Sequence, residues 1–489
     1  MTLAINNSLK VPGPEPLPIV GRMLNSIRFA KDSIDYAGRL FQQYGSVASL
    51  AEGGGTNLYS PYPGCVGTVL AQGPECIRAV ATQSEIYHKC PLSARIYRLR
   101  DRSERTEPIR HFGVGLFGMN DQHHRQNRKL MLPAFHKQRL AGYMQDMIAI
   151  TDSELARMQP GESCEIAQMM QRLTLRIATR TLFGEDIAQG DYGTGQLMQD
   201  TFRVQGEAWT NLLPFDIPGL PFHHYLNLLS KFEQRMQDII DHKQNGDQPD
   251  ILSMLIRARY EETGLKLTQD ELLGHVGVIF AAGHDTSANA LNWTLFLLSQ
   301  HPQVMADLLD ELESVLQGNP PTMEQLTQLP FLERVIKESM RVLAPVPWNG
   351  RVTSQPTQLG GYDLPQGTEV FISIYHTHHL PELYPDPEAF NPYRWETIDP
   401  NSYEYNPFSA GSRICIGAGF AMLEIKVVLA MLLQRFRLEY IPAVPIDRTG
   451  FIVIRPKHGM LMKVHRQDRQ FTQGIGKVEG NIREMVKLA

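Results

Sequence analysis

Hydrophobic and polar positions change their spacing several times along this chain of 489 residues. From about 121 to 345 the apolar positions recur mostly at helical spacing, and glycine and proline gather at 213–221 and 245–249, which predicts helices joined by short connections. The clearest element is 268–301, where Thr268 and Glu271 have the spacing of a capping box. A helix of that length would span roughly 50 Å, so we expect it to run through the centre of the fold.

Shorter elements lie on both sides of this helical region. The pattern predicts helices at 32–45, 73–81 and 418–436, and short strands at 46–70 and 350–374, with a strand pair at 450–464. Residues 1–18 form a proline-rich lead-in, 88–118 reads as a loop, and the polar tail 467–489 is expected to be mobile. No linker separates a second domain, so we expect one domain over 1–489, mainly α with small β regions (α+β).

Composition excludes several classes of protein. Lys+Arg is 47 and Asp+Glu is 52, so the net charge of 47 − 52 = −5 argues against a general nucleic-acid binder. Five scattered cysteines argue against a disulfide scaffold and fit a reducing compartment. No signal peptide and no run of about 18 apolar residues is present, and the longest clean apolar run is 427–433. We therefore expect a cytoplasmic protein without a transmembrane segment, and peripheral membrane contact stays open.

The segment FSAGSRICIG, from Phe408 to Gly417, carries the strongest chemical signal. Gly411 permits a tight backbone turn. A thiolate at Cys415 would face the unpaired N–H groups and positive dipole end of the predicted following helix, which lower its pKa and make it a suitable metal ligand. Phe408 can shield the sulfur, and Arg413 can pair with a nearby anion. A lone loop cysteine is more often a buried apolar residue, but this combination argues against that interpretation.

This segment resembles the F-x-x-G-x-R-x-C-x-G signature of the cytochrome P-450 family, the haem-thiolate monooxygenases, and every fixed position is present. The resemblance covers roughly 10–466 and implies a haem b (iron protoporphyrin IX) between the long central helix and the cysteine loop. Cys415 would then be the axial iron ligand, and such a thiolate favours O–O cleavage. The implied reaction inserts one oxygen atom from O2 into a lipophilic molecule by hydroxylation or epoxidation.

A second motif, Ala282-Gly283-His284-Asp285-Thr286, falls in the middle of the predicted long helix. It resembles the family's oxygen-activating motif, A-G-x-D-T. Gly283 lets another group approach the backbone and can allow the helix to open locally. The resemblance implies that Asp285 and Thr286 supply protons. The alternative is a solvent-facing aspartate beside a core threonine.

The pair Glu338 and Arg341 has i,i+3 spacing on a predicted helix. Spacing alone is weak evidence, because it recurs at Glu154 and Arg157, which we interpret as a solvated surface pair. The context FLERVIKESMRVLAP resembles the family's E-x-x-R helix, and Arg394 in FNPYRW resembles the third member of its Glu–Arg–Arg cluster. The resemblance implies a structural role for these three, with His378 near them.

Basic residues elsewhere resemble the family's haem-propionate partners. His124 and Arg128, four residues apart in DQHHRQNRKLMLPAF, could clamp one carboxylate, although His124 stands where many members have tryptophan. Arg351 in VPWNGRV resembles another propionate-binding arginine. Each of these residues could instead be a surface charge.

The family's substrate-contact regions map onto 95–118, about 201–222, 275–286, 344–349 and 450–452. The expected lining residues are Leu116, Phe117, Phe280, Ala344, Val346, Trp348 and Phe451, and they suggest a fatty acid or a terpenoid. The haem domain consumes the whole length, so electrons must come from a separate ferredoxin or flavodoxin with its reductase. A basic face formed by Arg125, Lys129, Lys137, Lys426 and Arg435 could dock it, with ordinary solvated charges as the alternative.

Three rival functions stay open at this point. A peroxide-driven haem-thiolate enzyme or isomerase often lacks the acid–alcohol pair, so Asp285 and Thr286 argue against it. A non-catalytic haem sensor or electron carrier and a helical protein without a cofactor are the others. A zinc site is disfavoured, because the histidines at 223–224 and at 376, 378 and 379 have no cysteine partners at zinc spacing.

Overall fold

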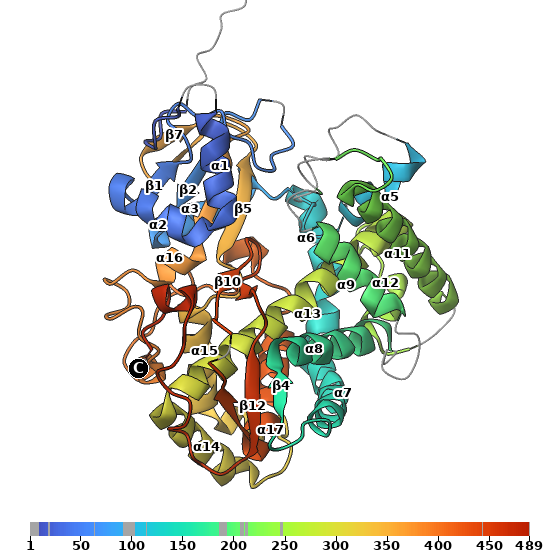
Figure 1. The fold of residues 1–489 in the computed structure, drawn as a ribbon. Coiled ribbons are helices and arrows are strands. Elements are labelled where there is room, and N and C mark those ends of the chain that lie inside the picture. Colours follow the sequence, from blue (N-terminus) through green and yellow to red (C-terminus); the bar gives the residue numbers. More distant parts are fainter. Residues whose placement is uncertain are drawn as a thin grey trace, which may run out of the picture.

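The helix predicted at 268–301 is α13 (Gln269–Gln300) in the computed structural model of the chain, where it crosses the molecule (Figure 1). Its capping box is present, since Glu271 N donates to Thr268 Oγ1 at 3.2 Å and Thr268 N donates to the Glu271 carboxylate at 2.8 Å. Every position from 287 to 298 is buried. This part of α13 is therefore buried on every side, and the helix packs on α8 (Ile166–Phe183), α15 (Pro330–Val342) and α17 (Ala418–Arg435).

The structure describes residues 9–17, 20–62, 64–90, 103–113, 115–184, 193–205, 210, 214–244, 248–442 and 444–488. Most of the buried apolar side chains form one large cluster around α13, and two smaller clusters lie around the main sheet. The remaining helices are α1 (Gly21–Lys31), α2 (Ser33–Tyr44), α3 (Pro74–Thr82), α5 (Glu107–Gly113), α6 (Asp121–Met131), α7 (Lys137–Leu155), α9 (Gly193–Gln205), α11 (Pro221–Lys243), α12 (Ile251–Arg257), α14 (Pro302–Leu316) and α16 (Ile374–His378).

The main sheet has five strands in the order β1-β2-β8-β5-β3. These are β1 (Val47–Ser49), β2 (Thr68–Ala71), β8 (Glu369–Ser373), β5 (Trp348–Thr353) and β3 (Tyr87–His88), and only β2 and β8 pair in parallel. A second sheet joins β4 (Ser163–Glu165), β12 (Leu461–Arg466) and β9 (Phe436–Tyr440), and two hairpins are β6 (Thr357–Leu359) with β7 (Tyr362–Leu364) and β10 (Arg448–Thr449) with β11 (Arg455–Pro456). The mainly α architecture with small β regions is therefore confirmed, while a single domain stays a prediction.

Two predictions about the C-terminal region were wrong. The segment 450–464 is not one strand pair, because β11 pairs with β10 while β12 lies between β4 and β9. The tail is not loose either, since Val478, Ile482 and Met485 are at most 3% exposed. Lys487 bridges to Ala389 and its N–H donates to the Glu388 carbonyl at 2.9 Å. Apolar residues spaced through a polar sequence anchor this tail on the core.

Two further expectations need correction. Glu154 is not a solvated surface residue: it is fully buried and accepts from Arg172 Nε at 2.8 Å and from Arg176 Nη1 at 2.7 Å, with Arg157 at the rim. The predicted loop 88–118 contains β3 at its start and the helix α5, and its residues 91–102 and 114 lie outside the described residues.

Candidate active site

The loop before α17 is shaped by glycine and by its own backbone hydrogen bonds. Gly411 has φ +68°, and a Cβ there would lie 2.3 Å from the Ala81 carbonyl oxygen, so no other residue fits without displacement. Cys415 N donates to the Phe408 carbonyl at 2.8 Å. The N–H of Gly417, which caps α17, donates toward the Cys415 sulfur. These contacts fix the thiol at the start of the helix, as the sequence motif predicts.

The pKa of Cys415 is raised, contrary to the expectation from the helix dipole. Burial is the main cause, and it outweighs the lowering effects of the Gly417 N–H and of the positive charges on Arg128 and Lys89. The residue nevertheless has a large accessible surface. We interpret the two facts together: the thiol faces a recess surrounded by protein. A metal cation in front of the sulfur would favour the thiolate in such a site.

The middle of α13 carries an accessible strip within an otherwise buried helix. Val278, Ala282 and Thr286 are spaced four residues apart and are partly exposed, as are Ile279 and Gly283 between them. A Cβ added to Gly283 would meet nothing within 4 Å. Because α17, which follows Cys415, packs on α13, the strip and the thiol are brought to the same region of the fold. Val278 and Ile279 fall within the expected substrate-contact region 275–286, although the sequence analysis did not name them individually, and their helical spacing from Ala282 and Gly283 places them on the strip.

The acid and alcohol of the A-G-x-D-T segment have separate hydrogen-bond partners. Thr286 Oγ1 donates to the Ala282 carbonyl at 2.6 Å, and α13 continues as an α-helix through this point. The Asp285 Oδ1 atom accepts from Asn289 Nδ2 at 3.0 Å and from Gln171 Nε2 of α8 at 3.4 Å. Asp285 is therefore tethered at the side of the accessible strip rather than free in solvent.

Basic residues from four segments gather near Cys415, and we call Lys89, His124, Arg128, Arg351 and Arg413 the basic cluster. Arg413 Nη2 donates to the Met119 carbonyl and to Asn120 Oδ1, both at 2.7 Å, and Asn120 Oδ1 also accepts from Lys89 N at 2.9 Å. Burial, reinforced by neighbouring positive charges, lowers the pKa of Lys89 to about 7 and that of His124 to about 3. His124 is therefore neutral at physiological pH, and Lys89 is an unforeseen member of the cluster.

Among the described residues, the cations of the basic cluster are not paired with carboxylates, and Asp121 acts on Arg413 only from beyond ion-pair distance. In the part of the chain that the structure describes, no carboxylate forms an ion pair with Lys89, Arg128, Arg351 or Arg413. Arg351 is 3% exposed, and the buried Nε of Arg413 has no hydrogen-bond partner within the described ranges. Buried charges without partners are costly. A ligand with two carboxylates and an iron atom reaching the Cys415 sulfur would satisfy both features, so the residues present fit a haem.

The Glu338 cluster is assembled as the sequence motif predicts. Glu338 and Arg341 are both fully buried, and Arg394 Nε donates to Glu338 Oε1 at 2.9 Å. Trp395 Nε1 donates to the other carboxylate oxygen at 2.9 Å. Arg341 Nη1 also donates to the carbonyl of His378 at 2.9 Å, while the His378 ring accepts from Asn406 N. These bonds tie α15 to the irregular segment 385–406.

The expected pocket residues are only partly brought together. Phe280 is fully buried on the side of α13 opposite the accessible strip, where its ring lies 4.7 Å from that of His284, so it does not line the strip. Trp348 and Phe451 pack around Phe29 in an aromatic cluster near the main sheet. Leu116 and Ala344 are buried and Val346 is partly exposed. Phe117 is 43% exposed and lies under the Lys89 ammonium.

Three of the five residues expected to form a basic face are already paired with carboxylates. Lys129 lies 2.6 Å from Glu261. In the same way, Lys426 pairs with Glu333 at 2.8 Å and Arg435 with Asp152 at 2.7 Å. Arg125 and Lys137 are exposed. The positive charge available to an acidic partner is smaller than the sequence suggests.

Two of the five histidines considered for zinc, His376 and His379, have other partners. The His376 ring contacts Ser373 Oγ and the Ile34 carbonyl, and the His379 ring contacts the Tyr375 carbonyl. No group of three histidine, cysteine or acidic residues with metal-binding geometry occurs among the described residues.

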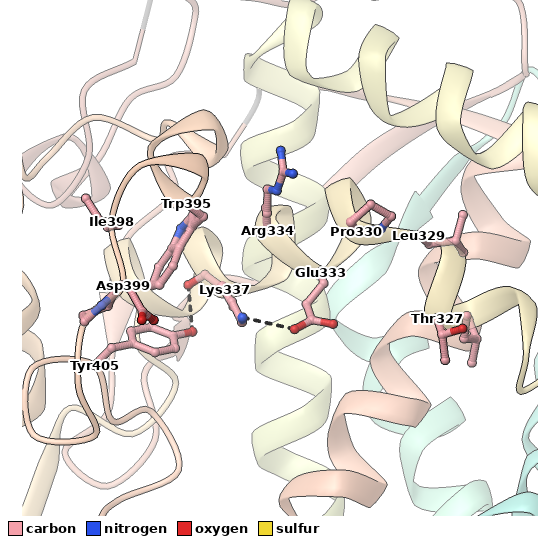
Figure 2. Close-up of a pocket in the computed structure, with 12 residues that line it drawn as sticks. Thr327, Leu329, Pro330, Glu333, Arg334, Lys337, Trp395, Ile398, Asp399 and Tyr405 are labelled. Carbon is pink, nitrogen blue, oxygen red and sulfur yellow. Dashed lines mark hydrogen bonds and ion pairs between the residues drawn. The ribbon is translucent and has the colours of Figure 1, made fainter.

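A surface pocket of about 350 Å³ lies apart from the Cys415 region, at the start of α15. Figure 2 shows Lys337 between Glu333, its ion-pair partner at 3.1 Å, and the ring of Tyr405, whose hydroxyl donates to the Lys337 carbonyl. Trp395 forms part of its wall. The pocket includes no residue of α13 or of the basic cluster, so it does not belong to the site described above.

Fold and site together define a haem-binding oxidoreductase. The cytochrome P-450 family model matches residues 11–463, so the chain belongs to this family. The chain is a haem-containing monooxygenase that uses O2, redox partners and lipophilic substrates. No helix within the described residues has the length and hydrophobicity needed to span a bilayer.

Two curated relatives and one solved structure show the extent of the similarity. The chain is 32% identical over 384 residues to cyclooctat-9-en-7-ol 5-monooxygenase of Streptomyces melanosporofaciens, covering 76% of this chain and 80% of that protein. Pentalenene oxygenase of Streptomyces avermitilis is 30% identical over 382 residues, with coverage of 76% and 81%. The solved structure of retinoic acid bound cyanobacterial CYP120A1 superposes with a TM-score of 0.78 at 25% identity, covering 94% of this chain and all of that chain.

Proposed function

We propose that this monooxygenase binds haem b through the Cys415 thiolate and oxidises a terpenoid. The observation that carries the haem site is the basic cluster, whose buried charges lack carboxylates, beside an accessible thiol at a helix start. The terpenoid class rests on two relatives whose names describe oxidation of an unsaturated cyclic alcohol and of pentalenene. Fatty acids are the less favoured class, because no name among the relatives cited specifies one.

Residues of the chain would bind the haem at its two propionates and at its iron. Lys89, Arg128, Arg351 and Arg413 would neutralise the two propionates, and the neutral His124 would donate a hydrogen bond to one of them. Bound haem supplies the redox chemistry that splits O2 and transfers one oxygen atom. The Gly417 N–H donates to the sulfur, which would withdraw charge from the thiolate and set its donor strength.

The accessible strip of α13 would serve the oxygen and proton side of the reaction. Gly283 leaves space for a diatomic molecule beside the helix, and the small side chain of Ala282 would leave room for the haem next to it. The Thr286 hydroxyl, which donates to the Ala282 carbonyl, can rotate to donate toward that space. Asp285, tethered by Asn289 and Gln171, would pass protons inward. The balanced reaction takes O2, two electrons, two protons and substrate R–H to R–OH and water.

Electrons would come from a separate ferredoxin or flavodoxin. Arg125 and Lys137 are exposed charges that an acidic partner could use. A single haem domain and a cytoplasmic location stay predictions.

The test of the haem ligand uses the purified full-length protein with its haem. The ferrous carbonyl complex is expected to absorb at the long wavelength typical of thiolate-ligated haem, and Cys415→Ser should abolish that band. The matched control is Cys164→Ser, a partly buried thiol in β4, which should leave it intact. A wild-type band at the position typical of imidazole ligation would refute the proposal.

The substrate class is tested by titrating the same protein with terpene alcohols, cyclic terpenes and fatty acids of similar size. A shift of the ferric absorption band with terpenoids, followed by an oxygenated product under reducing conditions with O2, is expected. Shifts and products confined to fatty acids would overturn the terpenoid assignment.

A further inference from the structure

The loop between β1 and β2 wraps around a buried carboxylate. Glu369, the first residue of β8, is fully buried. Its carboxylate accepts from Leu58 N at 2.9 Å and from Tyr59 N and Ser60 N, both at 2.6 Å. Thr68 Oγ1 donates to it at 2.6 Å as well. A carboxylate offers about four acceptor positions, so these donors saturate it and fix the path of the loop against the main sheet.

The side chain of Tyr59 reaches from this loop to the strand that carries Arg351. Tyr59 is 3% exposed, and its ring lies 5.2 Å from that of Phe371 in an edge-to-face contact. Its hydroxyl donates to the Arg351 carbonyl at 2.8 Å. A buried tyrosine hydroxyl needs a hydrogen-bond partner, and here the backbone of β5 supplies it.

Gly350 makes room for this contact. A Cβ at Gly350 would lie 2.8 Å from the Tyr59 hydroxyl oxygen and 3.3 Å from the Tyr59 Cζ atom. The tyrosine ring therefore occupies the space that a side chain at position 350 would need. Glycine is the residue that allows such a close approach to a strand backbone.

The same stretch of β5 contacts the loop that ends at Cys415. Arg351 Nη1 donates to the Gly350 carbonyl at 2.8 Å and to Asn349 Oδ1. Asn349 Nδ2 donates in turn to Ser409 Oγ at 2.8 Å. The backbone of 349–351 therefore sets where the guanidinium lies relative to the cysteine loop.

We propose that Tyr59 is a positioning residue, which holds β5 so that Arg351 is placed to bind a haem propionate. This inference rests on the proposed haem site. Tyr59 acts through the strand, because its hydroxyl is bonded to the Arg351 carbonyl. A cation that is already held in its binding geometry loses less freedom when an anion binds. Loss of the Tyr59 hydroxyl should therefore weaken haem retention, and it should do so only while Arg351 is present.

The experiment measures haem transfer from the full-length haem-loaded protein to apomyoglobin. Tyr59→Phe should speed the transfer by about threefold to tenfold, because a neutral hydrogen bond has roughly that effect on an equilibrium. Arg351→Leu should speed it more. The double variant should be no faster than Arg351→Leu alone, because two residues that act through one contact are not additive.

The reduction potential of the haem provides a second measurement. A cation beside a propionate favours the reduced haem, which carries one positive charge less at the iron. Arg351→Leu should therefore lower the potential, and Tyr59→Phe should lower it in the same direction by a smaller amount.

The matched control is Tyr87→Phe. Tyr87 is also fully buried, and its hydroxyl donates to a backbone carbonyl, that of Gln358 in β6, at 3.2 Å. Urea denaturation should show similar losses of stability for Tyr59→Phe and Tyr87→Phe. Haem transfer and the reduction potential should change only for Tyr59→Phe, since Tyr87 does not bond to the backbone of Arg351.

The outcomes separate this inference from the proposed haem site. A fast Arg351→Leu protein together with a Tyr59→Phe protein that matches the wild type would overturn the positioning role and leave the haem site standing. Equal acceleration by Tyr59→Phe with and without Arg351, or by Tyr87→Phe, would also overturn it, because general loosening of the sheet would then be the cause. An unchanged rate in Arg351→Leu would refute both the propionate contact and the inference built on it.

Discussion

Glu338 and Arg341 form a two-point ion pair in which Arg341 Nε and Nη2 lie 2.9 Å and 2.8 Å from the two carboxylate oxygens, with both side chains fully buried. The carboxylate also neutralises Arg394. Removing a buried counter-charge while its partners remain costs about 3–5 kcal/mol. We therefore expect Glu338→Gln to lower the free energy of unfolding by about that amount, as measured by urea denaturation.

The control for this prediction is an exposed pair with the same spacing. Glu107 and Arg110 lie 3.4 Å apart on α5, with side chains 46% and 36% exposed. Water and salt screen such a pair, so Glu107→Gln should change the free energy of unfolding by less than about 1 kcal/mol. Equal losses in both variants would show that burial does not set the importance of the Glu338 pair.

Haem retention should depend on Arg351. This side chain is 3% exposed, and among the described residues it donates hydrogen bonds to neutral groups, Asn349 Oδ1 and the Gly350 carbonyl. A hydrogen bond to a charged group contributes about 1.5–3 kcal/mol, so Arg351→Leu should speed haem transfer to apomyoglobin by roughly 10–100-fold. Arg39→Leu, which removes an exposed cation paired with Asp35 on α2, should leave the rate unchanged. Similar rates of haem transfer for the wild type and both variants would show that Arg351 does not help to hold the haem.

Glu424 should make stability fall as pH rises. It is fully buried on α17, and burial raises its pKa to about 8 from the ordinary 4.5, which the lowering effect of a hydrogen bond from Ser287 does not offset. The folded state therefore keeps a proton between pH 4.5 and 8 that the unfolded chain has lost. Folding stability should drop through this window by roughly 1.4 kcal/mol per pH unit.

The isosteric variant Glu424→Gln carries no titratable group at this position. Its free energy of unfolding, measured by urea at several pH values, should have a flatter pH profile and exceed that of the wild type at pH 8. Parallel profiles for the two proteins would show that Glu424 is ionised in the folded state.

Thr286 should govern how efficiently electrons are used. Loss of its hydroxyl removes the group expected to donate toward the oxygen site, and positioned proton donors typically contribute about 10²–10⁴ in rate. Thr286→Ala should cut product formed per electron consumed by at least about tenfold and increase release of hydrogen peroxide. Thr286→Ser, which restores a hydroxyl, should recover most of the yield, and a yield unchanged in the alanine variant would contradict the assigned role.

Helices with strong local signals were predicted closely. The capping box at Thr268 and the lack of proline define α13 within one residue at each end, and 418–436 corresponds to α17. Elements whose pairing depends on segments distant in the sequence were not predicted. The order β4-β12-β9 joins segments some 300 residues apart, and no local pattern encodes that pairing. Glu154 shows the same limit, because its close partners Arg172 and Arg176 lie on another helix, α8, and no local pattern encodes that contact.

In the site as well, residues in specific local motifs were predicted, and residues placed by distant contacts were not. Cys415 and the Glu338 cluster belong to segments whose spacing is specific, and their geometry agrees with the motifs. Lys89 was missed because its place near Cys415 depends on Asn120, which holds both Lys89 and Arg413. Phe280 was misplaced because an apolar residue next to a motif can lie on either side of a helix.

The backbone bridge between Lys487 and Ala389 links the last residues of the sequence to the buried Glu338 cluster. Ala389 also supplies a carbonyl to Arg341 at 3.0 Å, so the final residues brace the wall behind that guanidinium. Proteolysis after Arg466 would remove this support and would allow water to reach the ion pair between Glu338 and Arg341. Anyone trimming the protein for crystallisation, or adding a purification tag, would do better to work at its other end.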